Sequence, residues 1–183
     1  MKTEIETRFL EIDKEKMINM LKSIGAIDKG EIMMNEIIFY DKDLKSLENN
    51  TFCRLRKKGD KITLTYKSNA HQQTDSAKEI EFQVLDFKEP KLFLEAMGMI
   101  AYRTVEKYRH TFELNGTTLD IDTWPKIPTY IELEGDSIEI LKSIAQKLDL
   151  NWDDRFDGDA RFVYKKYGFD FDNIRTVTFD KFE

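Results

Sequence analysis

The fold is easiest to read in the segment AYRTVEKYRHTFELNGTTLDIDTWPKIPTYIELEG, residues 101–135. Apolar and polar residues alternate through much of this segment, as they do in a strand with one face on a hydrophobic core. Asn115-Gly116 interrupts the alternation, and this dipeptide favours the tight turn of a two-residue hairpin. We therefore predict strands over 101–114 and 117–123 joined as a hairpin, and a further strand over 130–135.

The same strand pattern recurs through the first half of the chain. It is bounded by turn residues, and Gly59-Asp60 predicts the turn of a second hairpin. The further predicted strands cover 1–10, 32–40, 51–58, 61–67 and 79–84. The chain therefore holds about eight strands, most of them linked as hairpins.

Three segments between these strands have apolar residues at helical spacing. Asp13 and Ser137 stand where an N-cap is expected, and Gly98 follows the end of the segment that contains Pro90. The predicted helices cover about 14–24, 89–97 and 138–148. Because helices are inserted between hairpins and do not alternate regularly with strands, we predict an α+β fold.

Composition limits the functional classes. The 183 residues carry 29 basic and 35 acidic side chains, a net charge of −6, which argues against a partner that is a nucleic acid polymer. The single cysteine, Cys53, excludes an intramolecular disulfide framework and indicates a reduced, cytoplasmic setting. The longest apolar run, about 96–102, is too short for a membrane span. We expect one domain over 1–168 and a tail over 169–183; the role of the tail and the existence of a homodimer stay open.

The polar faces of the predicted strands carry pairs of like charge two residues apart. Residues two apart share one face of a strand, so each pair lies side by side. The carboxylate pairs are Glu4 and Glu6, Glu79 and Glu81, Asp120 and Asp122, and Glu132 and Glu134; the cationic pairs are Arg54 and Arg56, and Lys107 and Arg109. A single strand of this kind is usually an ordinary sheet with its charged face in water, but the repetition along the chain is unusual.

Like charges repel, so these pairs do not help folding by themselves. Carboxylate pairs suit a divalent cation between them, and cationic pairs suit a polyanion. A triphosphate with bound Mg²⁺ or Mn²⁺ needs both. Burying so many ions without water would cost several kcal/mol apiece, against a total stability of about 5–15 kcal/mol. We therefore expect the charges to line a hydrated hollow.

These motifs resemble those of the CYTH superfamily, the triphosphate tunnel metalloenzymes, which include class IV adenylate cyclases and thiamine triphosphatases. Glu4-Ile5-Glu6-Thr7-Arg8 is similar to the opening Glu-x-Glu-x-Lys motif of that superfamily, and the later charged motifs follow in similar order to about residue 150. The resemblance implies a closed eight-stranded antiparallel β-barrel that forms a tunnel, with helices packed outside. It also implies a divalent metal, Mg²⁺ or Mn²⁺, and a small-molecule triphosphate substrate.

The resemblance also implies roles for individual residues. The metal ligands would be Glu4, Glu6, Asp120, Asp122, Glu132 and Glu134; the phosphate-binding residues would be Arg8, Arg54, Arg56, Lys67, Lys107 and Arg109; and the catalytic residues would be Glu79, Glu81 and Lys67. Arg8 departs from the lysine of the motif. An arginine keeps its proton near neutral pH, so this position can act electrostatically but not as a proton shuttle.

Three functions remain as hypotheses. The first is a metal-dependent phosphohydrolase of an inorganic or organic triphosphate. The second is an adenylate cyclase, which would use the same residues but release cyclic AMP and pyrophosphate from ATP. The third is a polyphosphate or nucleotide-binding module without turnover. Assays of phosphate release, cyclic AMP formation and binding distinguish them.

Overall fold

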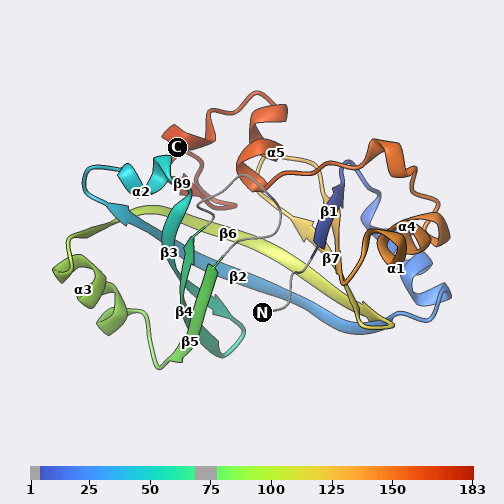
Figure 1. Ribbon diagram of the computed structural model, residues 1–183, viewed down its shortest axis with the longest axis horizontal. Helices are drawn as coiled ribbons and strands as arrows, with labels where there is room; N and C mark the ends of the chain where they lie inside the picture. The colour runs from blue at the N-terminus through green and yellow to red at the C-terminus, as the bar shows by residue number, and fades with distance from the viewer. Residues whose placement is uncertain (1–4, 69–77) are drawn as a thin grey trace. The chain divides into compact units, whose positions relative to one another are not determined.

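The computed structural model describes residues 5–68 and 78–183, and Figure 1 shows the course of the chain. The chain divides into two compact units. Unit 1 comprises residues 1–32 and 108–173, and unit 2 comprises residues 33–107 and 174–183. Two long strands, β2 (Ile27–Asp41) and β6 (Met99–Leu114), run through both units.

The strands form one sheet with the order β1-β8-β7-β6-β2-β3-β4-β5. The pairs β1–β8, β8–β7, β7–β6, β2–β3, β3–β4 and β4–β5 are antiparallel. Besides β2 and β6, the strands are β1 (Ile5–Phe9), β3 (Thr51–Lys58), β4 (Lys61–Ser68), β5 (Lys78–Val84), β7 (Thr117–Thr123), β8 (Tyr130–Gly135) and β9 (Thr176–Val177). With its helices, the chain is α+β, as predicted from the sequence.

The closed eight-stranded barrel is not confirmed. Among residues 5–68 and 78–183, hydrogen bonds leave an open path that begins at β1 and ends at β5, and β9 adds a ninth strand. Closure depends on pairing between strands remote in sequence, which alternation within each strand does not determine.

In unit 1, two helices pack on the apolar face of β1, β8, β7 and β6. These are α1 (Lys14–Ser23) and α4 (Ile138–Lys147), which Figure 1 draws on the same side of the molecule. Asp13 accepts a hydrogen bond from the backbone N–H of Lys16 at 2.9 Å and Ser137 accepts one from Ile140 at 3.3 Å, so both predicted caps are confirmed. The buried residues of this core include Leu21, Phe112, Leu119, Ile121, Ile131, Leu133, Leu141 and Ile144.

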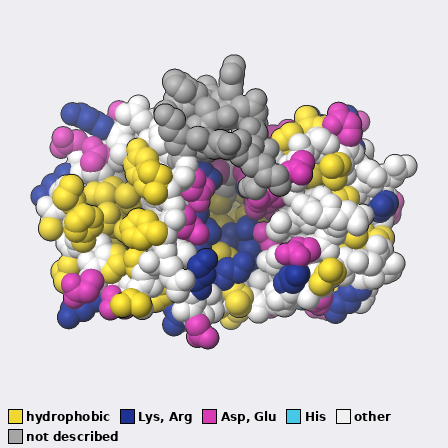
Figure 2. Space-filling model, turned by 60° about the horizontal axis from the view of Figure 1, so that its bottom comes forward, with side chains coloured by type: hydrophobic (Ala, Val, Ile, Leu, Met, Phe, Trp, Pro, Cys, Tyr) yellow, Lys and Arg dark blue, Asp and Glu magenta, His cyan; other side chains and the backbone are white. Residues whose placement is uncertain are grey.

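In unit 2, a smaller core contains Phe39, Cys53, Leu55, Leu64 and Leu94, the last from α3 (Lys88–Ala96). The face of β5 opposite its two glutamates was expected to be covered, but Ile80 and Phe82 are 62% and 54% exposed. Figure 2 shows hydrophobic side chains gathered on one face of the molecule, on the side where Figure 1 places α3 and β5. The exposure continues onto β4, where Tyr66 lies opposite Ile80 and is 42% exposed.

The end of the chain belongs to unit 2. Strand β9 runs parallel to β6, with Thr104 opposite Thr176 and Val105 opposite Val177. Strand β7 pairs with β6 only from Tyr108 onward, so β9 extends the sheet beside the earlier part of β6. The sequence left the role of this tail open.

Short helices complete the chain: α2 (Lys45–Glu48), α5 (Ala160–Lys166) and the 3₁₀ turns η1 (Trp152–Asp154) and η2 (Phe171–Asn173). In α5, the buried Tyr164 donates a hydrogen bond to the carbonyl of Pro125 at 2.7 Å and lies edge-on to Trp124. None of the helices in the described part of the chain is long and apolar enough to span a membrane.

Candidate active site

The carboxylates of unit 1 come together because their strands are neighbours in the sheet. In the registers of β1, β8 and β7, Glu6 lies opposite Glu134, and Asp120 lies opposite Glu132. Carboxylate oxygens of Glu6, Glu132 and Glu134 lie within 4.8 Å of one another. The predicted ligand Glu4 lies outside the described residues, so the structure gives no position for it.

Arg109 on β6 binds three of these acidic side chains. Its Nε and Nη2 donate to the two oxygens of Asp122, each at 2.6 Å, and its other contacts are with Asp120 at 2.7 Å and Glu132 at 3.1 Å. Burial opposes the charged form of Arg109, but the carboxylates outweigh burial and raise its pKa. Asp122 is fully buried and ion-paired, so bulk water does not reach it, whereas hydrated charges were predicted from the sequence.

Asp120 has a raised pKa. Burial raises the pKa of Asp120, and the charges of Asp122 and Glu132 add to that effect although Arg109 opposes it. The hydroxyl of Thr111 donates a hydrogen bond to Asp120 at 2.6 Å. A carboxylate crowded by other carboxylates in this way gains from a further cation.

Arg8 on β1 lies within the same group of carboxylates. Its Nη2 is 2.5 Å from Glu132 Oε2 and 3.1 Å from Glu6 Oε1, and its Nη1 donates to the carbonyl of Gly158 at 2.5 Å. Burial lowers the pKa of Arg8, but Glu132 and Glu6 more than compensate, so the pKa is raised. Arg8 Nε is buried and has no hydrogen-bond partner among residues 5–68 and 78–183.

The donor set of unit 1 fits a divalent metal ion. Hard cations such as Mg²⁺ and Mn²⁺ prefer carboxylate oxygens, and three such side chains converge here. The cluster contains five carboxylates, Glu6, Asp120, Asp122, Glu132 and Glu134, against two guanidinium groups, Arg8 and Arg109. The described side chains therefore carry an excess of three negative charges, which a bound cation would reduce.

The predicted cations of unit 2 lie on three strands, β3, β4 and β6. Arg54 and Arg56 are on β3, Lys67 is on β4, and Lys107 is on β6, where it is 5% exposed. Burial lowers the pKa of Arg54, and the adjacent charge of Arg56 adds to this effect. The buried Nε of Arg54 has no hydrogen-bond partner within the described ranges.

Sequence reasoning missed Glu36, a buried carboxylate among these cations. Glu36 on β2 lies directly opposite Arg56 on β3, and Arg56 Nε donates to Glu36 Oε1 at 2.7 Å. Burial alone would raise the pKa of Glu36, but Arg56, Arg54 and Lys107 outweigh burial and lower it. The segment Asn35-Glu36-Ile37-Ile38 holds one isolated acid and no charged pair, so the pattern that identified the other residues is absent.

The predicted catalytic residues lie on β4 and β5. Glu79 is 3.6 Å from Lys67 Nζ and 3.8 Å from Arg54 Nη2, and Glu81 accepts a hydrogen bond from the buried hydroxyl of Thr65 at 2.8 Å. In unit 2 the four predicted cations therefore face three carboxylates, Glu36, Glu79 and Glu81, an excess of one positive charge. This arrangement suits an anion.

A family comparison covers most of the chain. The model of the CYTH domain matches residues 2–156, which contain all the motifs described above. The chain belongs to the CYTH family. No curated protein sequence matches the chain.

Solved structures have a similar fold at low sequence identity. A Pyrococcus horikoshii OT3 protein is 21% identical, with a TM-score of 0.73 over 87% of this chain and 98% of its own. A Vibrio parahaemolyticus protein named as a candidate adenylate cyclase is 15% identical, with a TM-score of 0.75 over 90% and 98% of the two chains. A candidate adenylyl cyclase from Hippeastrum, named for a dominant triphosphatase activity, is 12% identical, with a TM-score of 0.64 over 92% and 96%. At these identities the likeness concerns the fold alone.

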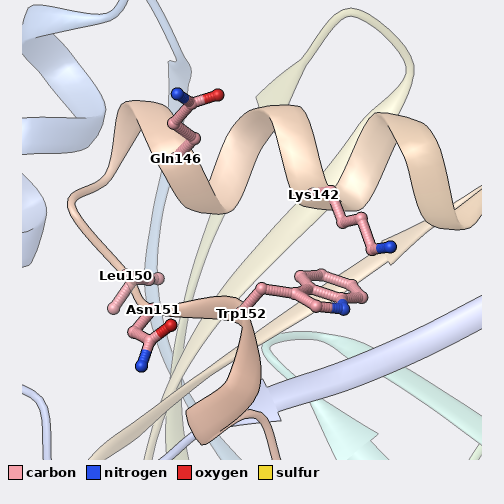
Figure 3. A pocket seen from close by; sticks show the side chains of 5 residues that line it. All are labelled: Lys142, Gln146, Leu150, Asn151 and Trp152. Atoms are coloured by element: carbon pink, nitrogen blue, oxygen red, sulfur yellow. The ribbon is translucent and has the colours of Figure 1, made fainter.

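One concavity of this CYTH chain is lined by residues outside the two charged clusters. Figure 3 shows it between α4 and η1, with the ammonium group of Lys142 near the ring of Trp152. Its volume is about 430 Å³, and Gln146, Leu150 and Asn151 complete its lining. None of the predicted metal or phosphate ligands lines it, so we do not place the active site there.

Proposed function

We propose that this chain is a divalent-metal-dependent phosphohydrolase that acts on a triphosphate. The observation that carries the proposal is the separation of charge between the units. Unit 1 holds a carboxylate cluster with an excess of negative charge, and unit 2 holds a cation cluster with an excess of positive charge. A metal triphosphate carries a cation that suits the first cluster and phosphate groups that suit the second.

In this proposal each unit supplies one part of the chemistry. Glu6, Glu132 and Glu134 hold Mg²⁺ or Mn²⁺, with Asp120 and Asp122 close to them, and Glu4 belongs to the same set as a prediction from the sequence. The bound ion supplies Lewis-acid polarisation of a phosphoryl oxygen. Arg54, Arg56, Lys67 and Lys107 bind phosphate oxygens and neutralise the charge that develops during transfer. Arg109, for which the sequence predicted a phosphate contact, is instead held by Asp120, Asp122 and Glu132. Glu79 or Glu81 orients the attacking water.

The names of related proteins support this chemistry and its nearest alternative. The Hippeastrum protein is named for a dominant triphosphatase activity, and the Vibrio protein is named as a candidate adenylate cyclase. A cyclase would bind the same metal triphosphate but direct the ribose hydroxyl of ATP at the α-phosphorus. We favour hydrolysis because neither the sequence nor the described structure supplies an evident adenine-binding motif.

The decisive experiment compares products. The purified chain is incubated with tripolyphosphate, thiamine triphosphate or ATP, each with Mg²⁺ and with Mn²⁺, and phosphate, pyrophosphate and cyclic AMP are measured. We expect metal-dependent phosphate release. Cyclic AMP with pyrophosphate would assign the cyclase, and binding without any product would assign the non-catalytic module; either result would overturn the proposal.

A variant connects the activity to the proposed metal site. We expect Glu6→Gln to lower metal-dependent turnover by at least about 10–100-fold, because removal of even the outer partners of a metal site has effects of that size. Glu31→Gln is the matched control, because Glu31 pairs with Lys14 at the surface of unit 1. Equal turnover by the two variants would show that the metal ligands are wrongly assigned.

The remaining predictions about the setting of the enzyme are proposals as well. We propose a cytoplasmic protein whose partner is the small-molecule substrate and which binds neither nucleic acid polymers nor membranes. The arrangement of the charges around one tunnel, the single domain over 1–168 and a homodimer stay predictions.

A further inference from the structure

Arg8 occupies a position that a bound metal ion would need. It lies directly opposite Glu132 in the β1–β8 register, and its Nη2 contacts Glu132 Oε2 at 2.5 Å and Glu6 Oε1 at 3.1 Å. Glu6 and Glu132 are two of the three side chains whose oxygens converge within 4.8 Å. The guanidinium group therefore already neutralises part of the candidate metal site.

Both oxygens of Glu132 are engaged by guanidinium groups. Arg8 contacts Oε2, and Arg109 Nη2 donates to Oε1 at 3.1 Å. A divalent ion coordinates carboxylate oxygens at about 2.0–2.6 Å, which is closer than a guanidinium nitrogen normally approaches. Because the two positive groups repel each other, a metal ion that binds Oε2 competes with Arg8 for Glu132.

The backbone holds Arg8 firmly in this place. The segment before α5 forms an isolated bridge with β1: the N–H of Arg8 donates to the carbonyl of Phe156 at 3.2 Å, and the N–H of Phe156 donates to the carbonyl of Arg8 at 2.7 Å. Arg8 Nη1 donates to the carbonyl of Gly158 at 2.5 Å in the same segment. The side chain is only 7% exposed, so water screens its charge weakly.

We propose that Arg8 is an internal counter-ion of the carboxylate cluster that competes with a divalent cation and weakens metal binding by the substrate-free protein. This inference rests on the proposed function, since it assumes that Glu6 and Glu132 are metal ligands. It gives Arg8 a role different from the phosphate contact predicted from the sequence. It also explains the use of arginine: the planar group with several donors reaches Glu6, Glu132 and Gly158 at once, whereas an ammonium group is a single point.

The test measures binding of Mn²⁺ alone by the metal-free protein, with free Mn²⁺ followed by electron paramagnetic resonance. Arg8→Gln removes the charge and should bind Mn²⁺ at least about tenfold more tightly, which corresponds to about 1.4 kcal/mol. Arg8→Lys keeps the positive charge but places it on a single ammonium group, so its affinity for Mn²⁺ should rise less. Arg155→Gln is the control, because Arg155 pairs with Asp157 in the same segment and contacts none of the predicted ligands in the described structure.

The outcomes separate this inference from the proposed function. Unchanged or weaker Mn²⁺ binding by Arg8→Gln, with loss of binding in Glu6→Gln, would overturn the counter-ion role and leave the metal site intact. Equal Mn²⁺ binding by Glu6→Gln and the unaltered chain would instead refute the metal site itself. If circular dichroism shows that Arg8→Gln does not fold, Arg8→Lys becomes the test variant. An Mn²⁺ affinity of Arg8→Lys equal to that of the unaltered chain would then refute the counter-ion role.

Discussion

Glu36 offers the sharpest test of the cation cluster in unit 2. Its side chain is 7% exposed and accepts the hydrogen bond from Arg56 Nε at 2.7 Å. Removal of one partner of a buried ion pair costs about 3–5 kcal/mol. The side chain of Arg56 is 21% exposed, so water can partly replace the lost partner, and we place Glu36→Ala at the lower limit, about 3 kcal/mol.

The assay is thermal unfolding at neutral pH. For a chain of this length, 1 kcal/mol shifts the Tm by about 2–4 °C, so Glu36→Ala should lower it by about 6–12 °C. Glu36→Gln keeps an acceptor for Arg56 but loses the charge, and we expect about half that loss. Glu31→Gln again serves as the control, because exposed pairs contribute about 0–1 kcal/mol. A Tm for Glu36→Ala equal to that of Glu31→Gln would refute the reasoning.

The pH dependence follows from the lowered pKa of Glu36. A carboxyl group with a lowered pKa in the folded state contributes its full stability above its ordinary pKa, 4.5 here, and loses it as the pH falls through the lower, folded value. The difference in stability between the unaltered chain and Glu36→Gln should therefore be constant above about pH 4.5 and should shrink below it. A difference that grows on acidification would contradict the assignment of Arg56, Arg54 and Lys107 as its stabilising partners.

Two further predictions concern Asp28 in unit 1 and residues 174–183 in unit 2. The hydrogen bond from His110 and a backbone N–H bond from Gly30 lower the pKa of Asp28 to about 2. Asp28→Asn should therefore lower the free energy of unfolding by about 1 kcal/mol at neutral pH, measured by urea unfolding, and this loss should vanish between about pH 4 and 2. A loss that is the same at every pH would refute the role of the charge. Removal of residues 174–183 deletes β9, the hydrogen bond from Arg103 Nε to the carbonyl of Ile174, and the stacking of Arg175 on Tyr102 at 3.7 Å. Unit 2 should therefore lose at least about 3 kcal/mol of stability and become sensitive to limited proteolysis. An unchanged cleavage rate would show that the tail is dispensable.

The local features of the fold were predictable because they depend on a few adjacent residues. Asn115 and Gly116 both adopt positive φ values, 51° and 82°, as the two-residue turn requires. The caps at Asp13 and Ser137 form within one helical turn, and each satisfies a backbone donor that would otherwise lack a partner. Such interactions depend little on the remainder of the chain.

The features that the sequence did not predict depend on contacts between distant segments. The alternation in β5 indicated one covered face, but the strand lies at an edge and Ile80 and Phe82 remain exposed. The parallel pairing of Thr176 with Thr104 joins residues far apart in sequence, and two residues of strand are too few to produce a periodic pattern. The open path of hydrogen bonds likewise depends on how strands meet and not on their individual patterns.

For the candidate site, the spacing of charged residues along each strand predicted which charges would gather. It did not predict how they would pair. The pattern placed Asp120 and Asp122 on one face and Arg109 on a neighbouring strand, and the structure brings them to within 2.7 Å. It could not indicate that Arg109 would bind three carboxylates at once, because that depends on register and side-chain reach. Glu36 was not predicted as a site residue because a single acid in an apolar strand has no partner visible in the sequence.

The pairings explain how the chain can hold so many ions without a ligand. Within unit 1, Arg109 and Arg8 reduce an excess of five negative charges to three, and the deepest carboxylate, Asp122, is the one held by two bonds from Arg109. Within unit 2, the buried Glu36 is paired with Arg56. The internal pairing of buried carboxylates such as Asp122 and Glu36 limits the desolvation cost in each cluster. Arg8 is buried and bound to two proposed metal ligands, and this is why its replacement should change metal affinity more than that of the exposed Arg155.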